Sequence, residues 1–329
     1  MSDNLDKSHH DAVETAAPPT KKRGCAAHCK RFWWAYVIGF IVVLLVVILP
    51  VIYVGYPNIA QRDVNRSTLE ITEMEITDPS PDSFHIRLTQ VIGSKSKYHP
   101  NLDAFNADVS LPNSDEPFLK LNVPAVKAVD GAVAKIDQDV DLPNGDAFAA
   151  YSLAVMKQEE VSMIVFGETG LKEGSLPKTT VTYNKTVTMK GLNGLKGFNV
   201  TEFEITPRDD DGNNMRGNVF IPNPSVMTLT MGNLTLSLSV DGKDIGKSFM
   251  NNVVIRPGDN NIEMKSKVDQ AQVLGLIAGR NARYRNGIVP IDIVGDSAVY
   301  NGEDLPYYSK ALASNKLHVE LNVGAALGS

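Results

Sequence analysis

The chain has 329 residues, of which 43% are hydrophobic, and a formal net charge of -6 at pH 7. These values suit one or two packed domains and exclude a chain that is disordered throughout. Residues 1–31 contain six basic and four acidic side chains, which leaves 26 basic and 34 acidic side chains for the remainder. This acidic remainder argues against nucleic acid as a partner.

An apolar segment without a charged residue or histidine extends from Phe32 to Gln61. It exceeds the ~20 residues that a helix needs to cross a membrane, and aromatic residues lie near both of its ends. A cleaved signal peptide would have a core of only about 7–15 apolar residues, followed by a small-residue cleavage site. We therefore predict a retained transmembrane helix over 32–56, with Pro50 bending its last turns.

The flanks of this segment predict its orientation. The preceding stretch KKRGCAAHCKR carries five basic residues and no acid, whereas Arg62 beyond the segment is followed at once by Asp63. Because positive charge stays in the cytosol, we predict a single-pass type II protein with a large domain on the lumenal side. The tail, residues 1–31, is polar and unpatterned, so we predict that it is disordered.

Two cysteines and four glycosylation sequons are the candidate modification sites. Cys25 and Cys29 lie in the predicted cytosolic juxtamembrane segment, where acylation and idle reduced thiols are equally good interpretations. With His28 they supply too few ligands for a metal site, and they leave no disulfide for the lumenal part. The sequons, all on the predicted lumenal side, are at Asn65, Asn184, Asn199 and Asn233.

A long internal repeat organises the rest of the chain. Thr72 to Thr77 is TEMEIT, and 129 positions later Thr201 to Thr206 is TEFEIT. Two further dipeptide landmarks recur at nearly the same offset. They are Gly167-Glu168 with Gly295-Asp296, and Leu176-Pro177 with Leu305-Pro306. A period of about 129 residues has the size of a domain, so we predict two tandem domains over 65–190 and 198–326.

Each predicted domain has a mainly β pattern. Leu234, Leu236, Leu238 and Val240 alternate with polar residues, which is typical of a strand with one buried face. Several short strands with turns about every ten residues predict a β-sandwich. Each domain also contains one stretch of helical texture, Asp146 to Lys157 and Gln270 to Ala282. Such a helix either caps the core or covers an apolar cavity that is open to lipid.

The segment from Phe220 to Asp269 carries a characteristic order of turns: an Asn-Pro at a strand end, a Gly before the next strand, a Gly-x-x-x-Gly turn and a Pro-Gly turn. The residues are Asn223-Pro224, Gly232, Gly242 with Gly246, and Pro257-Gly258. This order resembles the late-embryogenesis-abundant type-two β-sandwich. It resembles in particular a fungal family of uncharacterised proteins that carry such domains behind one N-terminal membrane helix, several of which are vacuolar. The first repeat lacks the Gly-x-x-x-Gly turn and the Pro-Gly pair.

The sequence offers little for catalysis. GDSAV, Gly295 to Val299, has Val where a serine-hydrolase elbow needs its second Gly, so Ser297 is a weak nucleophile candidate. Asp296 and His318 are better explained by a turn and by a strand surface. The acidic stretch RDDDGNN, from Arg208, fails the spacing of a calcium-binding loop and is interpreted as a hairpin loop. We expect no catalytic residue, no metal and no cofactor.

These observations favour a non-enzymatic membrane-anchored protein that binds or scaffolds partners at a membrane surface. Binding of lipid or another apolar ligand inside a sandwich is the alternative function, and hydrolysis is a distant one. An apolar cavity of a few hundred cubic ångströms inside a sandwich favours the ligand hypothesis. The resemblance implies the vacuolar membrane, with the plasma membrane or another membrane of the secretory pathway as alternatives.

Overall fold

The computed structural model describes residues 25–280 and 282–327, and for residues 25–32 it describes the backbone alone. The chain divides into two compact units that meet at Val54 and Gly55. Of the tail that is predicted to be disordered, residues 1–24 lie outside the described part of the chain.

The first unit is the N-terminal apolar helix. α1 (Cys25–Pro50) begins before the predicted start at Phe32 and passes into a π-helical turn, η1 (Val51–Gly55). α2 (Tyr56–Arg66) continues the helical chain. The stretch Trp33–Arg66 is long and apolar enough to cross a membrane. Pro50 has no amide hydrogen to donate and its ring crowds the preceding turn, which accounts for the irregular turn that follows it.

In the second unit, Gly55–Ser329, α2 is fixed to the edge of a β-sheet. Gln61 Nε2 donates to the carbonyl of Thr182, and Gln61 Oε1 accepts from the amide of the same residue, both at 2.8 Å. The buried Lys185 Nζ donates to the carbonyls of Val64 and Ser67, where the helix ends and its last carbonyls need donors. The first sandwich therefore begins directly at the end of the apolar helical stretch.

The first repeat forms two layers of strands. One layer contains β1 (Thr68–Thr77), β2 (Ser83–Gly93) and β7 (Ala132–Asp141). The other is a six-stranded sheet of β3 (Asn101–Leu102), β4 (Phe105–Ser110), β5 (Pro117–Val123), β6 (Val126–Lys127), β8 (Glu160–Lys172) and β9 (Thr179–Lys190). α3 (Gly145–Lys157) connects β7 to β8 and begins at Asn144, whose side chain caps two backbone amides.

The second repeat follows the short helix η2 (Asn193–Leu195). Its strands are β10 (Asn199–Ile205), β11 (Met215–Asn223), β12 (Met227–Val240), β13 (Lys243–Ile255), β14 (Gly258–Val268), β15 (Ile288–Tyr300), β16 (Glu303–Asp304) and β17 (Lys316–Asn322). Its helices are α4 (Gln270–Ile277), α5 (Pro306–Ala313) and α6 (Val323–Leu327).

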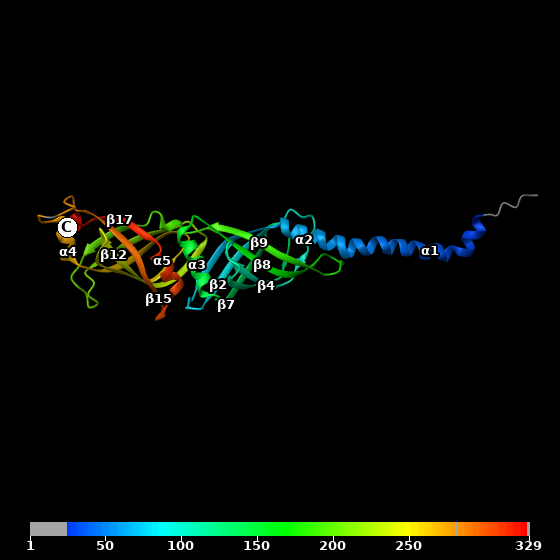
Figure 1. Ribbon diagram of the computed structural model, residues 1–329, viewed down its shortest axis with the longest axis horizontal. Coiled ribbons are helices and arrows are strands. Elements are labelled where there is room, and N and C mark those ends of the chain that lie inside the picture. Colours follow the sequence, from blue (N-terminus) through cyan, green and yellow to red (C-terminus); the bar gives the residue numbers. More distant parts are fainter. Residues whose placement is uncertain (1–24, 281, 328–329) are drawn as a thin grey trace, which may run out of the picture. The chain divides into compact units, whose positions relative to one another are not determined.

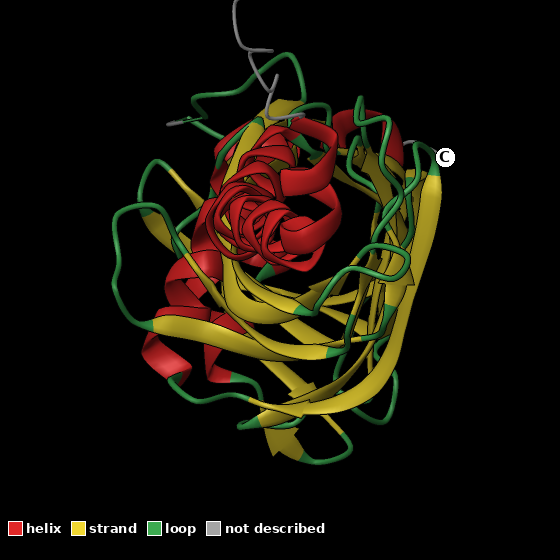
Figure 2. Ribbon diagram, turned by 90° about the vertical axis from the view of Figure 1, so that its right-hand side faces the viewer, coloured by secondary structure: helices red, strands yellow, loops and turns green. Residues whose placement is uncertain are grey.

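The prediction of a mainly β fold behind one apolar helix is confirmed, and the sheets are not closed. In Figure 2 the strands and their connecting loops make up most of the second unit. The burial of β12 alternates as predicted, with Leu234, Leu236 and Leu238 buried and the intervening residues partly exposed. One sheet runs through β10, β11, β14, β13, β12, β1, β2 and β7, and β15 adds to β12.

The repeat in the sequence is accompanied by a repeat in the pairing register of the strands. Equivalent strand pairs in the two repeats match residues that are 128 or 129 positions apart. In the first repeat Glu73 pairs with Thr89, Leu88 with Ile136 and Ala107 with Gly167. The corresponding pairs in the second repeat are Glu202 with Asn218, Gly217 with Met264 and Leu236 with Gly295. Both repeats therefore use one strand framework, because a slip of one residue would turn every side chain to the opposite face.

Two bulges also recur at equivalent positions. Thr72 and Thr201 are the extra residues in the first hairpin of each repeat, and each hydroxyl lies 3.3 Å from a carbonyl of the neighbouring strand. Phe118 and Ile245 are skipped in the pairing of β5 with β4 and of β13 with β12. A bulge re-aims the side chains around it, so the recurrence places Phe118 and Ile245 in the same structural position.

The helices are where the two repeats differ. Leu176-Pro177 precedes β9, whereas Leu305-Pro306 begins α5, a helix that the sequence pattern did not predict. The predicted helix from Gln270 to Ala282 is too long, because α4 ends at Ile277. Ala278 is extended and Gly279 has a φ of +104°, a conformation that a helix cannot contain.

The two repeats are joined by a shared sheet. β1 pairs in parallel with the start of β12, with Met74 opposite Met227 and Ile76 opposite Leu229. Beside this junction α3 packs on α5 (Figure 1), and the rings of Phe148 and Tyr307 meet edge to face at 4.9 Å. The junction is therefore built from backbone pairing and aromatic burial together.

We predict that Phe148→Ala lowers the free energy of unfolding by about 3–5 kcal/mol, because this side chain is only 1% exposed and contacts aromatic rings from both repeats. The measurement is urea unfolding of the full chain in detergent, followed by circular dichroism. Leu153→Ala on the same helix is the control, since Leu153 is 37% exposed. Equal losses of unfolding free energy in the two variants would contradict the burial of Phe148 between the two repeats.

Candidate ligand-binding cavity

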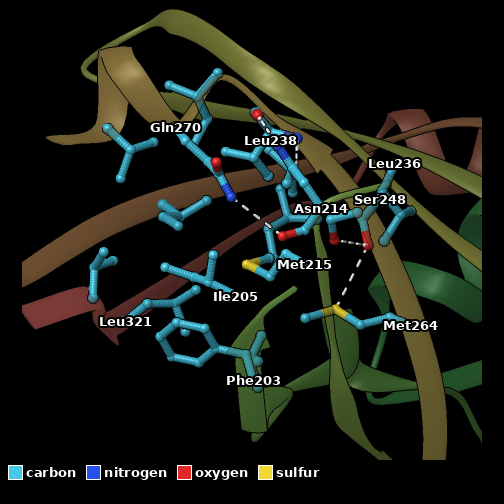
Figure 3. A pocket seen from close by; sticks show the side chains of 18 of the residues that line it. Phe203, Ile205, Asn214, Met215, Leu236, Leu238, Ser248, Met264, Gln270 and Leu321 are labelled. Carbon is cyan, nitrogen blue, oxygen red and sulfur yellow. Dashed lines mark hydrogen bonds between the residues drawn. The ribbon is translucent and has the colours of Figure 1, made fainter. Parts of the chain in front are cut away.

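A cavity of about 120 Å³ lies in the core of the second repeat. Figure 3 shows Phe203, Ile205, Met215 and Leu321 around this space. Its walls come from strands β10 to β15 and β17 and from helices α4 and α6. The apolar lining residues include Phe198, Val200, Phe203, Ile205, Met215, Val219, Leu236, Leu238, Ile245, Met264, Val273, Ile291, Ile293 and Leu321.

The more exposed part of the lining belongs to β10 and α4. Phe203 and Ile205 on β10 are half-buried, and Leu274 on α4 is 42% exposed. Among the described strands, β10 pairs only with β11, and β17 pairs only with β15. The cavity therefore lies beside the two sheet edges that remain unpaired in this repeat.

The polar side chains in the cavity wall are bonded to the protein itself. Asn214 Nδ2 donates to the carbonyl of Val268 at 2.8 Å, and Asn214 Oδ1 accepts from the amide of the same residue at 2.9 Å. Ser266 Oγ lies 3.0 Å from Ser248 Oγ, and Gln270 Nε2 donates to the Asn214 carbonyl at 3.3 Å (Figure 3). With these groups paired, the wall offers mainly apolar contact to an occupant.

The equivalent space in the first repeat is filled. Only about 30 Å³ remains there, inside a wall that includes Phe84, Phe118, Phe148 and Tyr151. The rings of Phe118 and Tyr151 stack at 4.3 Å. In the second repeat Ile245 takes the bulge position of Phe118, so a smaller side chain stands where the first repeat places an aromatic ring.

The helices complete the contrast between the two cores. α3 has 13 residues and buries Phe148, Tyr151 and Val155 in the first core. α4 has only 8 residues, and among them only Val273 is buried. Of the two helix roles that the sequence left open, α3 caps a filled core, whereas α4 lies against a cavity.

The cavity residues were not predicted individually from the sequence. A signal was present, because the first repeat has aromatic residues at Phe118, Phe148 and Tyr151 and the second has none at the corresponding places. Reading that signal requires the position of each bulge and the length of each helix, which the repeat offset alone does not give.

The four predicted glycosylation asparagines are all exposed. Asn65 is on α2, Asn184 on β9, Asn199 at the start of β10 and Asn233 on β12. Asn65 Oδ1 accepts from Gln61 Nε2 at 2.8 Å, and Asn233 Oδ1 accepts from the amide of Asn252 at 2.9 Å. Cys25 and Cys29 are in α1, and their side chains lie outside the described part of the chain.

The residues considered for hydrolysis are not brought together. Ser297 lies within β15 rather than at a turn from a strand into a helix. Asp296 forms an ion pair with Lys247 at 2.6 Å, and His318 Nδ1 lies 2.8 Å from Asp292 Oδ1. In the described structure these contacts engage the acid and the base with other partners, and the acid–base–nucleophile order of a triad is not formed.

The acidic stretch that begins at Arg208 forms the loop between β10 and β11. Asp209 Oδ1 accepts from the amide of Asn213 at 2.8 Å, and Asp209 Oδ2 accepts from Asn213 Nδ2 at 3.0 Å. This hydrogen bonding lowers the pKa of Asp209. No group of three or more metal-ligand side chains occurs within the described residues.

Residues 116–238 match the model of a family described as a protein of unknown function (DUF3712), so the chain contains a DUF3712 domain over this range. The match begins just before β5, within the first repeat, and ends in β12 of the second. A comparison with curated proteins gives no match.

Solved structures align over most of the chain, but with low similarity. The periplasmic chaperone SfaE is 9% identical, with 77% of this chain and 98% of the chaperone covered and a TM-score of 0.17. Red sea bream transglutaminase is 11% identical, with 77% and 31% covered and a TM-score of 0.21. A bacterial adhesin from Mobiluncus mulieris is 9% identical, with 70% and 81% covered and a TM-score of 0.20.

A histidine on the outer face of the first repeat is the clearest pH-sensitive group. His85 Nδ1 lies 2.7 Å from Asp139 Oδ1, and Nε2 lies 2.8 Å from Asp137 Oδ1. The hydrogen bond with Asp139, helped by Asp137, raises the pKa of His85. The protonated ring is thus favoured in the folded state.

We predict that His85 stabilises the fold below its unfolded pKa of about 6.5 and that this contribution is lost as the pH rises through the higher folded pKa. The melting temperature of His85→Gln should therefore lie further below that of the wild type at pH 5.5 than at pH 8.5. The exposed His99, which forms none of the ion pairs described for this chain, gives the control variant His99→Gln. A pH-independent difference for His85→Gln would contradict this assignment.

Proposed function

We propose that this chain is a membrane-anchored binding protein whose second β-sandwich holds an apolar ligand group, such as the end of a lipid acyl chain. The observation that carries the proposal is the 120 Å³ cavity at a core position that the first repeat fills. A framework that can be closed with aromatic rings, as in the first repeat, is left open in the second.

The size of the cavity limits the ligand. Pockets for whole drug-sized molecules measure about 300–1,000 Å³, whereas an engineered apolar cavity of about 150 Å³ takes benzene. The volume of about 120 Å³ is smaller than the few hundred cubic ångströms expected from the sequence for a ligand site, and it suits one end of a hydrocarbon chain rather than a whole lipid. The polar atoms in the wall are already paired, so an apolar group leaves none of them without a partner.

The membrane is the natural source of such a ligand. The chain carries an apolar helix that is long enough to span a bilayer, and its sandwiches follow that helix without a long linker. We propose a cytosolic N-terminus, a lumenal ectodomain and, from the resemblance of the Phe220 to Asp269 segment, the vacuolar membrane. The basic flank at Lys21 to Arg31 supports this orientation.

We predict that Ile245→Phe, which copies the aromatic residue of the first repeat, reduces ligand binding about tenfold by filling the cavity. The full chain in nanodiscs is exposed to a fatty acid with a diazirine near its methyl end, illuminated, and digested for mass spectrometry. Labelling of the wild type should concentrate on cavity residues such as Met215 and Met264.

The matched control is Phe118→Ile, the reverse change at the equivalent bulge of the first repeat. It should leave labelling of the second core unchanged, while reduced packing lowers the stability of the first. Undiminished labelling of the second core in Ile245→Phe, with the melting temperature retained, would refute the ligand proposal.

The proposed orientation predicts that endoglycosidase treatment increases the gel mobility of the wild-type protein isolated from cells. The shift should come from at least one of the four sequons and disappear when Asn65, Asn184, Asn199 and Asn233 are all changed to Gln. The contrary test uses sealed vesicles whose outer surface is the cytosolic face of the membrane. If no mobility shift occurs and added protease digests the large domain of these vesicles, the orientation is the reverse.

A second candidate function, docking of a protein partner, is favoured by a separate observation: the unpaired edge of β10.

A further inference from the structure

The repeat supplies an internal example of how one sheet edge is covered. In the first repeat the outer edge of β1 receives the start of β12 as a parallel strand. The amide of Met74 donates to the carbonyl of Val226 at 3.1 Å. Met74, Glu75 and Ile76 then face Met227, Thr228 and Leu229 in register.

The equivalent edge in the second repeat is unpaired. Phe203, Glu204 and Ile205 follow Met74, Glu75 and Ile76 by 129 positions, and both triplets pair on their other side with the same register. The bulges at Thr72 and Thr201 give both strands the same bend. β10, however, pairs only with β11 among the described strands, although it also contacts β17 and α6, so the backbone groups that correspond to the β1–β12 ladder have no strand paired with them.

Side chains along this edge indicate what kind of strand fits. Phe203 and Ile205 face the core and are half-buried, which favours apolar residues at alternate positions of an added strand (Figure 3). Glu202 and Glu204 point to the outer face, where Glu263 of β14 lies near them. Arg216 forms an ion pair with Glu204, and the exposed Lys265 on β14 is opposite Arg216, so the carboxylates outnumber these two cations. The residues of a partner strand that lie between its apolar positions face these glutamates, and basic side chains there complement the negative charge.

We infer that the free edge of β10 binds an extended segment of a partner protein as a parallel strand, with apolar residues facing Phe203 and Ile205 and basic residues beside the glutamates. The interaction reproduces between two proteins the pairing that joins the two repeats within one chain. It uses the outer edge of the sandwich and rests on the second candidate function, docking of a protein partner, while Phe203 and Ile205 also line the cavity.

The test uses the full chain in nanodiscs and a fluorescent peptide that copies residues 223–231, the segment that covers β1, with Thr228→Lys on its outer face. Saturable binding in the micromolar range is expected from fluorescence anisotropy. Absence of saturable binding up to about 1 mM would overturn the inference.

Backbone methylation of the peptide distinguishes strand addition from other modes of binding. In a parallel ladder the amide at position 228 points toward β10, whereas the amide at position 227 points away. N-methylation at 228 should weaken binding about tenfold through loss of one interstrand hydrogen bond, and N-methylation at 227 should leave binding nearly unchanged. Equal effects of the two methyl groups would rule out this register.

A matched pair of protein variants locates the site. Glu204→Lys should weaken binding about fivefold through charge repulsion. Glu75→Lys, at the equivalent position of the covered edge and with an equivalent ion pair to Arg87, should have no effect. Equal effects of the two variants would place the peptide elsewhere. If the chain alone oligomerises and Glu204→Lys renders it monomeric, the edge serves a second copy and the partner assignment is wrong.

Discussion

The parallel pairing of β1 with β12 is the interaction on which the rest of this structure depends. Together with the packing of α3 on α5 it joins the two repeats, and it makes one sheet of strands from both. Sheet edges carry unpaired amides and carbonyls that need a partner, water or cover. By covering β1, the junction leaves β10 as the equivalent edge without a strand. The asymmetry between the repeats thus begins in the backbone.

A second asymmetry lies in the cores. Residues 33–329 contain no cysteine, so their stability must come from burial, and the first repeat achieves this with stacked aromatic rings. The second repeat keeps the strand framework but has Ile245 at the bulge and a short α4 where the first has Phe118 and a longer α3. A filled core beside an open one is expected when one copy has a structural role and the other a binding role.

α2, which follows the apolar helix along the chain, is attached to the first repeat. Gln61 bonds both backbone groups of Thr182 on β9, and Lys185 caps the end of α2 with a buried ammonium group. Burial lowers the pKa of Lys185. Two backbone carbonyls nevertheless accept hydrogen bonds from its ammonium group, and this favours the protonated form. The filled repeat is therefore the one to which α2 is attached, while the repeat with the cavity follows it along the chain.

The sequence by itself determined the apolar helix, the repeat and most strands, because these depend on local periodicity and on turn residues. It also made Ser297 a weak nucleophile candidate, since Val299 occupies the position of the second Gly in a hydrolase elbow. It did not predict α5, where Pro306 begins a helix although Pro177 precedes a strand, and it extended α4 past Gly279. Tertiary structure alone decided the β1–β12 pairing, the free edge at Phe203 and the cavity around Ile245. Pairing between distant segments depends on which edges meet in space, and a cavity depends on the summed volumes of side chains from many strands, so neither is written in any one stretch of sequence.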